Sequence, residues 1–197
     1  MKDLTRDNVI ELLKSTYDLN KRNLSNLDLA GLDLRGVNLD GANLTRTHLQ
    51  NANLENSSLV GAQLVQTNFS YATLRHADFR EAEIRDANFR GAILGYAMMY
   101  NLNLSHLDFS ESRSGFLNFE FSNLENADFN GALLMGANFS NARLYNANLS
   151  HTALAGANFM HADVTRAIWN GADLRGVIGL ESPNLNGRKH GSSPTNS

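Results

Sequence analysis

The 197-residue chain lacks cysteine altogether, which excludes disulfides, thiolate metal ligands and cysteine nucleophiles. Its two prolines, Pro183 and Pro194, both lie near the C-terminus, so proline removes no backbone donor from the residues before them. The net charge of −3 at pH 7 is too small to imply non-specific attraction to nucleic acid. No apolar run approaches the roughly 18 residues of a membrane-spanning helix, and no secretory signal opens the chain. We therefore expect a cytoplasmic domain without a direct nucleic-acid or membrane partner.

Catalytic and cofactor-binding motifs are also missing. The chain has no G-x-S-x-G nucleophile elbow, no P-loop, and no G-x-G-x-x-G between a strand and a helix. The histidines are scattered over different repeat positions and the tail, which does not predict a shared metal site: His48, His76, His106, His151, His161 and His190. We predict that the protein is not an enzyme and that it binds no cofactor or metal.

A five-residue period organises most of the chain. From Leu19 to Leu174 a large apolar residue recurs at every fifth position without insertion or deletion, and Ser114 is the lone exception. Two residues earlier stands a smaller residue, mostly Ala, Thr or Ser, and polar residues fill the other positions. This period fits neither a helix, at about 3.6 residues, nor a strand, at about 2. It predicts the short side of a coil, with two inward side chains followed by a corner.

Glycine and asparagine mark the predicted corners. They recur two residues after the large residue, at Gly31, Gly36, Gly41, Asn51, Gly61, Gly91, Gly131, Gly136, Gly156, Gly171 and Gly176. The third position of a type II turn has a positive φ, which favours these two residue types. Four such sides close a square coil of about twenty residues, and the repeat region then holds about eight coils.

Several segments resemble the units of a known family. GANLT (41–45), NANLE (51–55), HADFR (76–80), GANFS (136–140) and GADLR (171–175) look like the A(D/N)LXX units of pentapeptide repeat proteins. The resemblance implies an all-β solenoid, specifically a right-handed quadrilateral β-helix, and a bacterial source. Within this fold we assign residues 1–17 to an N-terminal capping helix, 18–177 to the β-helix and 178–197 to a disordered C-terminal tail.

The N-terminal residues depart from the five-residue period. Thr5 is a plausible N-cap, and the residues after it form an apolar stripe at helical spacing: Val9, Ile10, Leu12 and Leu13. Solenoids need caps because an exposed β edge invites pairing with other chains. We therefore predict that this helix covers the open edge of the first coil.

The middle of the repeat region breaks the pattern most. Large residues replace the expected small ones at Leu102, Leu107 and Leu117, and Ser114 stands where a large residue is expected. A void and a buried unpartnered hydroxyl both cost free energy. Two outcomes remain open: a locally widened coil in which Leu117 refills the space, or a bulge that turns Ser114 outward.

Two outward-facing groups are candidate binding surfaces. The first, which we call the apolar corner, gathers large apolar residues when the sequence is projected at twenty residues per coil: Ile93, Tyr96, Met98, Tyr100, Phe116, Leu133 and Met135. Contiguous apolar and aromatic surface is typical of protein interfaces. The second, the arginine belt, consists of Arg75, Arg80, Arg85 and Arg90, one on each successive side. It is either a weak anion-binding band or a set of solvated, locally paired charges.

These features leave three candidate functions. The first is a rigid scaffold that binds another protein through the apolar corner. The second, which the family resemblance implies, is DNA mimicry toward gyrase or another type II topoisomerase, although the near-neutral charge argues against it. The third is a structural spacer without a specific partner. A homodimer through the C-terminal coil edge or the apolar corner is a further expectation, because no second helix is predicted to cap that end.

Overall fold

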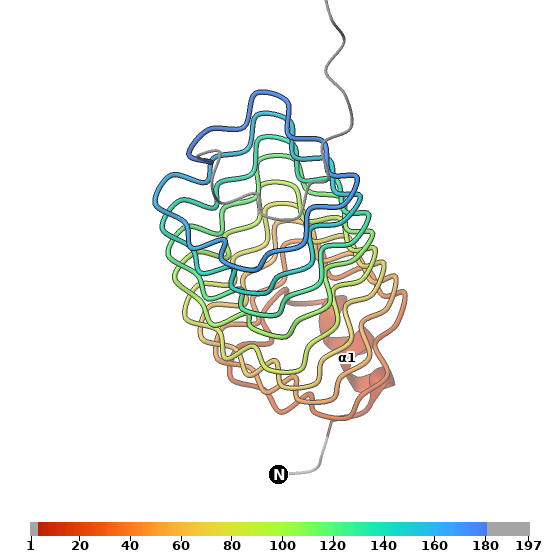
Figure 1. Ribbon diagram of the computed structural model, residues 1–197. Helices are drawn as coiled ribbons and strands as arrows, with labels where there is room; N and C mark the ends of the chain where they lie inside the picture. The colour runs from red at the N-terminus through yellow and green to blue at the C-terminus, as the bar shows by residue number, and fades with distance from the viewer. Residues whose placement is uncertain (1–3, 181–197) are drawn as a thin grey trace, which may run out of the picture.

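The protein is described here by a computed structural model, which covers residues 4–180. One helix, α1 (Arg6–Leu13), lies at the N-terminal end of coils stacked along a single axis (Figure 1). Within residues 4–180 no extended strands occur, and parallel bridges of single residues join the coils instead. The predicted disordered tail, 178–197, lies almost wholly outside the described residues.

Four ladders of these bridges run along the stack. Each ladder joins residues 20 apart in sequence, and the ladders begin with the pairs Asp18↔Asn38, Asn23↔Asn43, Asp28↔His48 and Asp33↔Asn53. One coil therefore takes 20 residues and has four sides, as the sequence predicts. No strands are assigned from which whole coils could be counted, so the total of about eight coils stays a prediction.

Inward phenylalanines form the centre of the core. Phe109 is fully buried and stacks between Phe89 and Phe129, with ring centroids 5.1 and 5.2 Å apart. Phe119, on another side of the coil, meets Phe109 edge to face at 5.5 Å and 75°. The stacking follows from the register, because a 20-residue coil places each inward side chain against its counterpart in the next coil. Each buried ring contributes roughly 1.5–3 kcal/mol before conformational entropy is subtracted.

The corners adopt the left-handed conformation that the sequence predicts. All of the predicted Gly and Asn corners have a positive φ, for example +62° at Gly41 and +57° at Asn51. A hydrogen bond from the Ala42 N–H to the Leu39 carbonyl, 3.0 Å long, closes the turn. Bulky residues also occupy corners, including Tyr96 at +59° and Phe116 at +58°. For such residues this conformation costs roughly 1–2 kcal/mol each, which the surrounding ladders must offset.

Helix α1 covers the first coil. Thr5 is its N-cap, as predicted, and a capping box forms because Thr5 Oγ1 accepts from the Asn8 N–H while Asn8 Oδ1 accepts from the Thr5 N–H. Val9 is fully buried against the core. Arg6 ties the helix to the coil by donating to the carbonyls of Asp28 and Ala30 at 2.7 and 2.9 Å.

The middle of the stack contains no bulge, so that alternative is wrong. Ser114 is only 1% exposed and points into the core column. The bridges Ile93↔Arg113 and Arg113↔Leu133 pass without interruption, and the Ser114 N–H donates to the Leu133 carbonyl at 2.8 Å. These ladder hydrogen bonds hold the backbone in register, so the serine stays inside despite its polarity.

The coils instead hold the additional large side chains inside, which favours the locally widened alternative. The large residues in the small-residue column are all buried: Leu102, Leu107 and Leu117. Their N–H groups do not make the corner hydrogen bond to the residue three positions earlier that closes regular turns in the described coils. The Leu102 N–H donates to Ser122 Oγ at 3.2 Å, and the bridge expected between Glu83 and Asn103 is absent from this part of the stack. The larger volume of these leucine side chains is thus accompanied by the loss of several backbone hydrogen bonds.

We expect Phe109→Ala to lower the free energy of unfolding by about 3–5 kcal/mol, because it removes one ring from the continuous stack and leaves a cavity that rigid ladders cannot close. Urea or guanidinium denaturation followed by circular dichroism measures the change. A loss below about 1 kcal/mol would contradict the tightly packed core described above.

Candidate functional site

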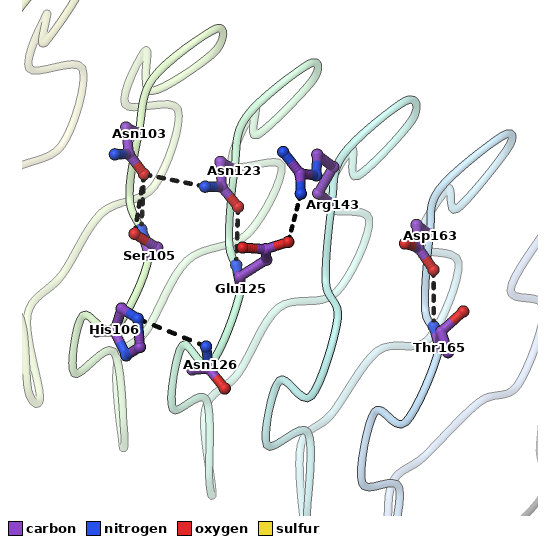
Figure 2. Close-up of polar contacts among 9 residues, drawn as sticks. All are labelled: Asn103, Ser105, His106, Asn123, Glu125, Asn126, Arg143, Asp163 and Thr165. Carbon is purple, nitrogen blue, oxygen red and sulfur yellow. Dashed lines mark hydrogen bonds and ion pairs between the residues drawn. The ribbon is translucent and has the colours of Figure 1, made fainter.

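Outward Asn and Asp side chains satisfy the backbone on most sides of the coil. The side chain just before a large inward residue accepts a hydrogen bond from the N–H two residues later. Figure 2 shows three cases with N···O distances of 3.3, 3.1 and 3.0 Å: Asn103–Ser105, Asn123–Glu125 and Asp163–Thr165. Asn123 also donates to Asn103 across adjacent coils at 3.2 Å. Such sides leave few backbone donors for a partner.

The middle part of one side lacks these side-chain acceptors, although Asp33, Asn53 and Asp173 supply them nearer the two ends of the same side. Its bridge ladder passes through Ile93, Arg113 and Leu133, and none of these carries an acceptor oxygen. Within residues 4–180, no group accepts a hydrogen bond from the N–H of Gly95 or Gly115. In the regular repeats an outward side chain reaches the equivalent N–H, so both of these N–H groups face the outer surface.

Gly95 and Gly115 differ from the other described glycines because neither has a positive φ. A Cβ at Gly115 would meet no atom within 4 Å, and a Cβ at Gly95 would come no nearer than 3.9 Å to the Gly115 carbonyl. Neither backbone conformation nor packing therefore requires glycine at these two positions. Because glycine has no side chain, the backbone at Gly95 and Gly115 is left uncovered, and we call this uncovered backbone the floor.

A ladder of aromatic rings borders this floor. His76, Tyr96 and Phe116 occupy equivalent corners of three successive coils, and we call them the aromatic ladder. The rings of His76 and Tyr96 stack at 5.1 Å, and those of Tyr96 and Phe116 at 5.6 Å. Phe116 covers Gly136 in the next coil, where a Cβ would approach its ring to 2.9 Å. Tyr96 and Phe116 remain 53% and 63% exposed, so their outer faces are available to a partner.

An open groove of ≈ 320 Å³ lies between the aromatic ladder and the bridge ladder of Ile93, Arg113 and Leu133. Its lining residues are Arg75, Ile93, Gly95, Tyr96, Arg113, Ser114, Gly115, Phe116, Leu133 and Met135. The groove brings together all of the predicted apolar corner except Met98 and Tyr100, which belong to the adjoining side. The site is therefore narrower than the predicted surface.

Ser114 is the most unusual lining residue. Several other inward hydroxyls donate to a carbonyl in the previous coil, as Thr67 Oγ1 does to the Leu44 carbonyl at 2.8 Å. Ser114 Oγ is buried and has no hydrogen-bond partner in the described part of the chain, as also happens at Ser57 and Ser112. Burying an unpaired hydroxyl costs about 1–3 kcal/mol, so the core beneath the groove contains a destabilising polar group.

The predicted arginine belt does not act as one unit. Three of its members pair with acids, in the ion pairs Arg80–Asp78, Arg85–Glu83 and Arg90–Glu111. Arg75 forms no ion pair with any residue from 4 to 180 and lines the groove instead. The paired members fit solvated local charges, and such surface pairs contribute little to stability.

Asp78 and Arg80 form the most buried of these pairs. Burial raises the pKa of Asp78, but hydrogen bonds from the Arg80 side chain and backbone outweigh this effect and hold the pKa below its usual range. Asp78 in turn raises the pKa of Arg80, with a smaller contribution from Tyr100. Both groups are therefore charged at neutral pH.

Arg113 is a site residue that the sequence reasoning missed. It occupies the ladder position between Ile93 and Leu133 and, like Arg75, makes no ion pair with a described residue. The sequence does contain a signal for it, because Arg113 lies 20 residues from both Ile93 and Leu133 and therefore falls in the same column. The unpaired N–H groups of Gly95 and Gly115 were also missed, since they arise from what the neighbouring side chains lack.

Neither a metal centre nor a membrane span is found in residues 4–180. No three His, Asp or Glu side chains there converge as metal ligands would. Helix α1 has eight residues, and no described helix has the length and apolar character needed to cross a bilayer.

Two family models match the chain. The model described as "Pentapeptide repeat region" matches residues 32–113, and the model described as "Pentapeptide repeats (8 copies)" matches residues 117–152 and 157–179. No curated protein matches the chain in sequence.

Solved structures with the same fold include two that superpose well. One is HetL, a pentapeptide repeat protein involved in heterocyst differentiation regulation from the cyanobacterium Nostoc sp. strain PCC 7120. It is 22% identical with a TM-score of 0.67, and the match covers 95% of this chain and 100% of HetL. The other is a trypsin-treated variant of QnrB1, a plasmid-mediated fluoroquinolone resistance protein, at 17% identity and a TM-score of 0.66, covering 83% of this chain and 87% of that one. At these identities the likeness concerns the fold alone.

We expect Ser114→Ala to stabilise the protein by about 1 kcal/mol, because it removes a buried hydroxyl without a partner. The matched control is Ser122→Ala, since Ser122 Oγ donates to the Met99 carbonyl at 2.8 Å and accepts from the Leu102 N–H. The control variant should lose about 1–3 kcal/mol. Chemical denaturation measures both changes, and destabilisation by Ser114→Ala would show that its hydroxyl is satisfied.

Asp78→Asn tests the ion pair through its pH dependence. A carboxyl whose folded pKa is lowered stabilises the fold above its unfolded pKa, which for Asp is about 3.9, and loses that contribution as pH falls through the folded pKa. We therefore expect wild type to be more stable than the variant by up to about 1 kcal/mol at pH 7, with the gap closing below about pH 4. Thermal melts from pH 7 to pH 2 measure it, and a gap that is constant over this range would refute the assignment.

Proposed function

The chain belongs to the pentapeptide repeat family, and on that premise we propose that it is a non-catalytic, rigid scaffold that binds another protein through the groove and the aromatic ladder. The observation that carries the proposal is the exposed stack of Tyr96 and Phe116 beside an open groove. Tyr and Phe are enriched in interfaces because they offer large contact area at a low cost in conformational entropy.

The conformation of these residues supports a binding role. Both Tyr96 and Phe116 adopt a positive φ, which costs free energy for a bulky residue, and the stacking of their rings offsets only part of that cost. Gly or Asn at the same corner would avoid the cost, as they do elsewhere in the stack. Residues held in a strained backbone conformation are often found at functional sites.

DNA mimicry toward a topoisomerase has less support. A mimic needs regularly spaced negative charge to imitate the phosphate backbone. Among the bridges of residues 18–178, Asp108↔Asp128 is the only pair that joins two acids, and the groove side carries Arg75 and Arg113 instead. The charge pattern therefore favours an interaction scaffold.

The proposal predicts that Phe116→Asp abolishes binding and leaves the fold intact. The matched control is Phe121→Asp, because Phe121 is also a corner residue, with φ of +58° and 59% exposure, but it lies one corner away from the aromatic ladder. Proteins retained from a lysate of the source organism are identified, purified and titrated against each variant. We expect the affinity to fall at least about tenfold for Phe116→Asp and to be unchanged for Phe121→Asp.

Two results would contradict this proposal. Equal loss of affinity in both variants would show that exposed aromatics act non-specifically. The absence of any partner, with a monomer for wild type and both variants by light scattering, would favour a spacer. A dimer that only Phe116→Asp disrupts would identify a second copy of the chain as the occupant.

A further inference from the structure

We propose that the groove recognises an acidic and apolar peptide segment of the partner, with an apolar side chain against the aromatic ladder and a carboxylate at the N–H groups of Gly95 and Gly115. This inference rests on the proposed function and specifies the chemistry of the partner. The expected ligand of the groove is a protein segment that carries a carboxylate.

The bare floor of the groove supplies the first argument. Gly95 and Gly115 offer backbone N–H donors that nothing in residues 4–180 occupies, on the outer side of the coil. Neighbouring coils lie about 4.8 Å apart. Two donors at that spacing can share one carboxylate, because each N–H···O contact spans about 2.9 Å. Backbone N–H groups that point into one concavity bind anions in many proteins.

The glycines themselves supply the second argument. A side chain at either position would fit sterically, since no atom lies close to the Cβ site. The same column holds Met135 and Ala155 in later coils, so the fold accepts side chains there. Glycine at 95 and 115 therefore keeps the N–H donors uncovered, which a binding role explains and stability does not.

Charge on this side supplies the third argument. Arg75 and Arg113 border the groove, and neither pairs with an acid in the described residues. Between Thr73 and Ala155 the outward positions of this side carry no Asp or Glu. The groove is thus locally positive in a protein of net charge −3, which complements an anionic partner.

The apolar wall completes the chemistry. Ile93 and Leu133 stand on one side of the floor, and Tyr96 and Phe116 stand on the other. A free inorganic anion would use the donors and arginines but not these walls. A ligand that joins a carboxylate to a large apolar side chain uses both, so the groove favours peptide over phosphate or sulfate.

The test uses ¹⁵N-labelled full-length protein and two matched probes, N-acetyl-L-phenylalanine and its neutral carboxamide. We expect the carboxylate to shift the amide signals of Gly95 and Gly115 and to bind at least fivefold more tightly than the carboxamide. The preference should decline as salt screens the arginines, and Arg75→Gln/Arg113→Gln should lower it to less than twofold.

Gly115→Met is designed to fill the floor, and Ala155→Met is its matched control in the same column. The first variant should lose carboxylate binding, and the second should keep it. Equal affinity for the two probes, or unchanged binding by Gly115→Met, overturns the inference.

The two proposals fail in different ways. A protein partner that depends on Phe116, found together with no preference for the carboxylate probe, would leave the scaffold in place and remove the acidic-segment inference. Carboxylate binding at Gly95 and Gly115 without any protein partner would establish the anion site and contradict the scaffold.

Discussion

The structure depends on a hydrogen-bond register of 20 residues between neighbouring coils. In the described coils the N–H of almost every large inward residue donates to the carbonyl 19 positions later, as from Leu19 to Asn38 at 2.8 Å, and Ile84 is an exception. This register stacks equal positions on top of one another, so the core becomes continuous columns such as the phenylalanine stack through Phe109. It also explains why Ser114 stays buried, because moving one serine outward would break ladder bonds on both sides.

The same register turns the surface into columns. Asn and Asp in a column cap the backbone and link adjacent coils, as Asn103 and Asn123 do. Where a column loses these residues, backbone donors become available at the repeat distance. The groove at Gly95 and Gly115 is such a place, and its walls come from the two adjacent columns. A binding site can therefore arise in this fold by substitution alone, without an inserted loop.

Much of this architecture was predictable because it repeats. The four-sided coil, the positive φ at Gly41 and Asn51, and the N-cap at Thr5 all follow from local residue preferences. The candidate site was predicted only in part. Tyr96 and Phe116 stand out as apolar residues. The two unpaired N–H groups instead arise because Ile93 and Arg113, two residues before Gly95 and Gly115, carry no acceptor oxygen. Choosing between a bulge and a widened coil likewise required the balance between ladder hydrogen bonds and side-chain volume.

The missing bridge between Glu83 and Asn103 weakens the contact between two neighbouring coils. In a solenoid each coil contacts only its neighbours, so the interface with the fewest hydrogen bonds is the joint at which the stack opens first. The aromatic contact between His76 and Tyr96 crosses this same interface on a different side. A partner that binds the aromatic ladder would contact both coils at this interface. Binding of the partner would therefore make the stack of coils more rigid.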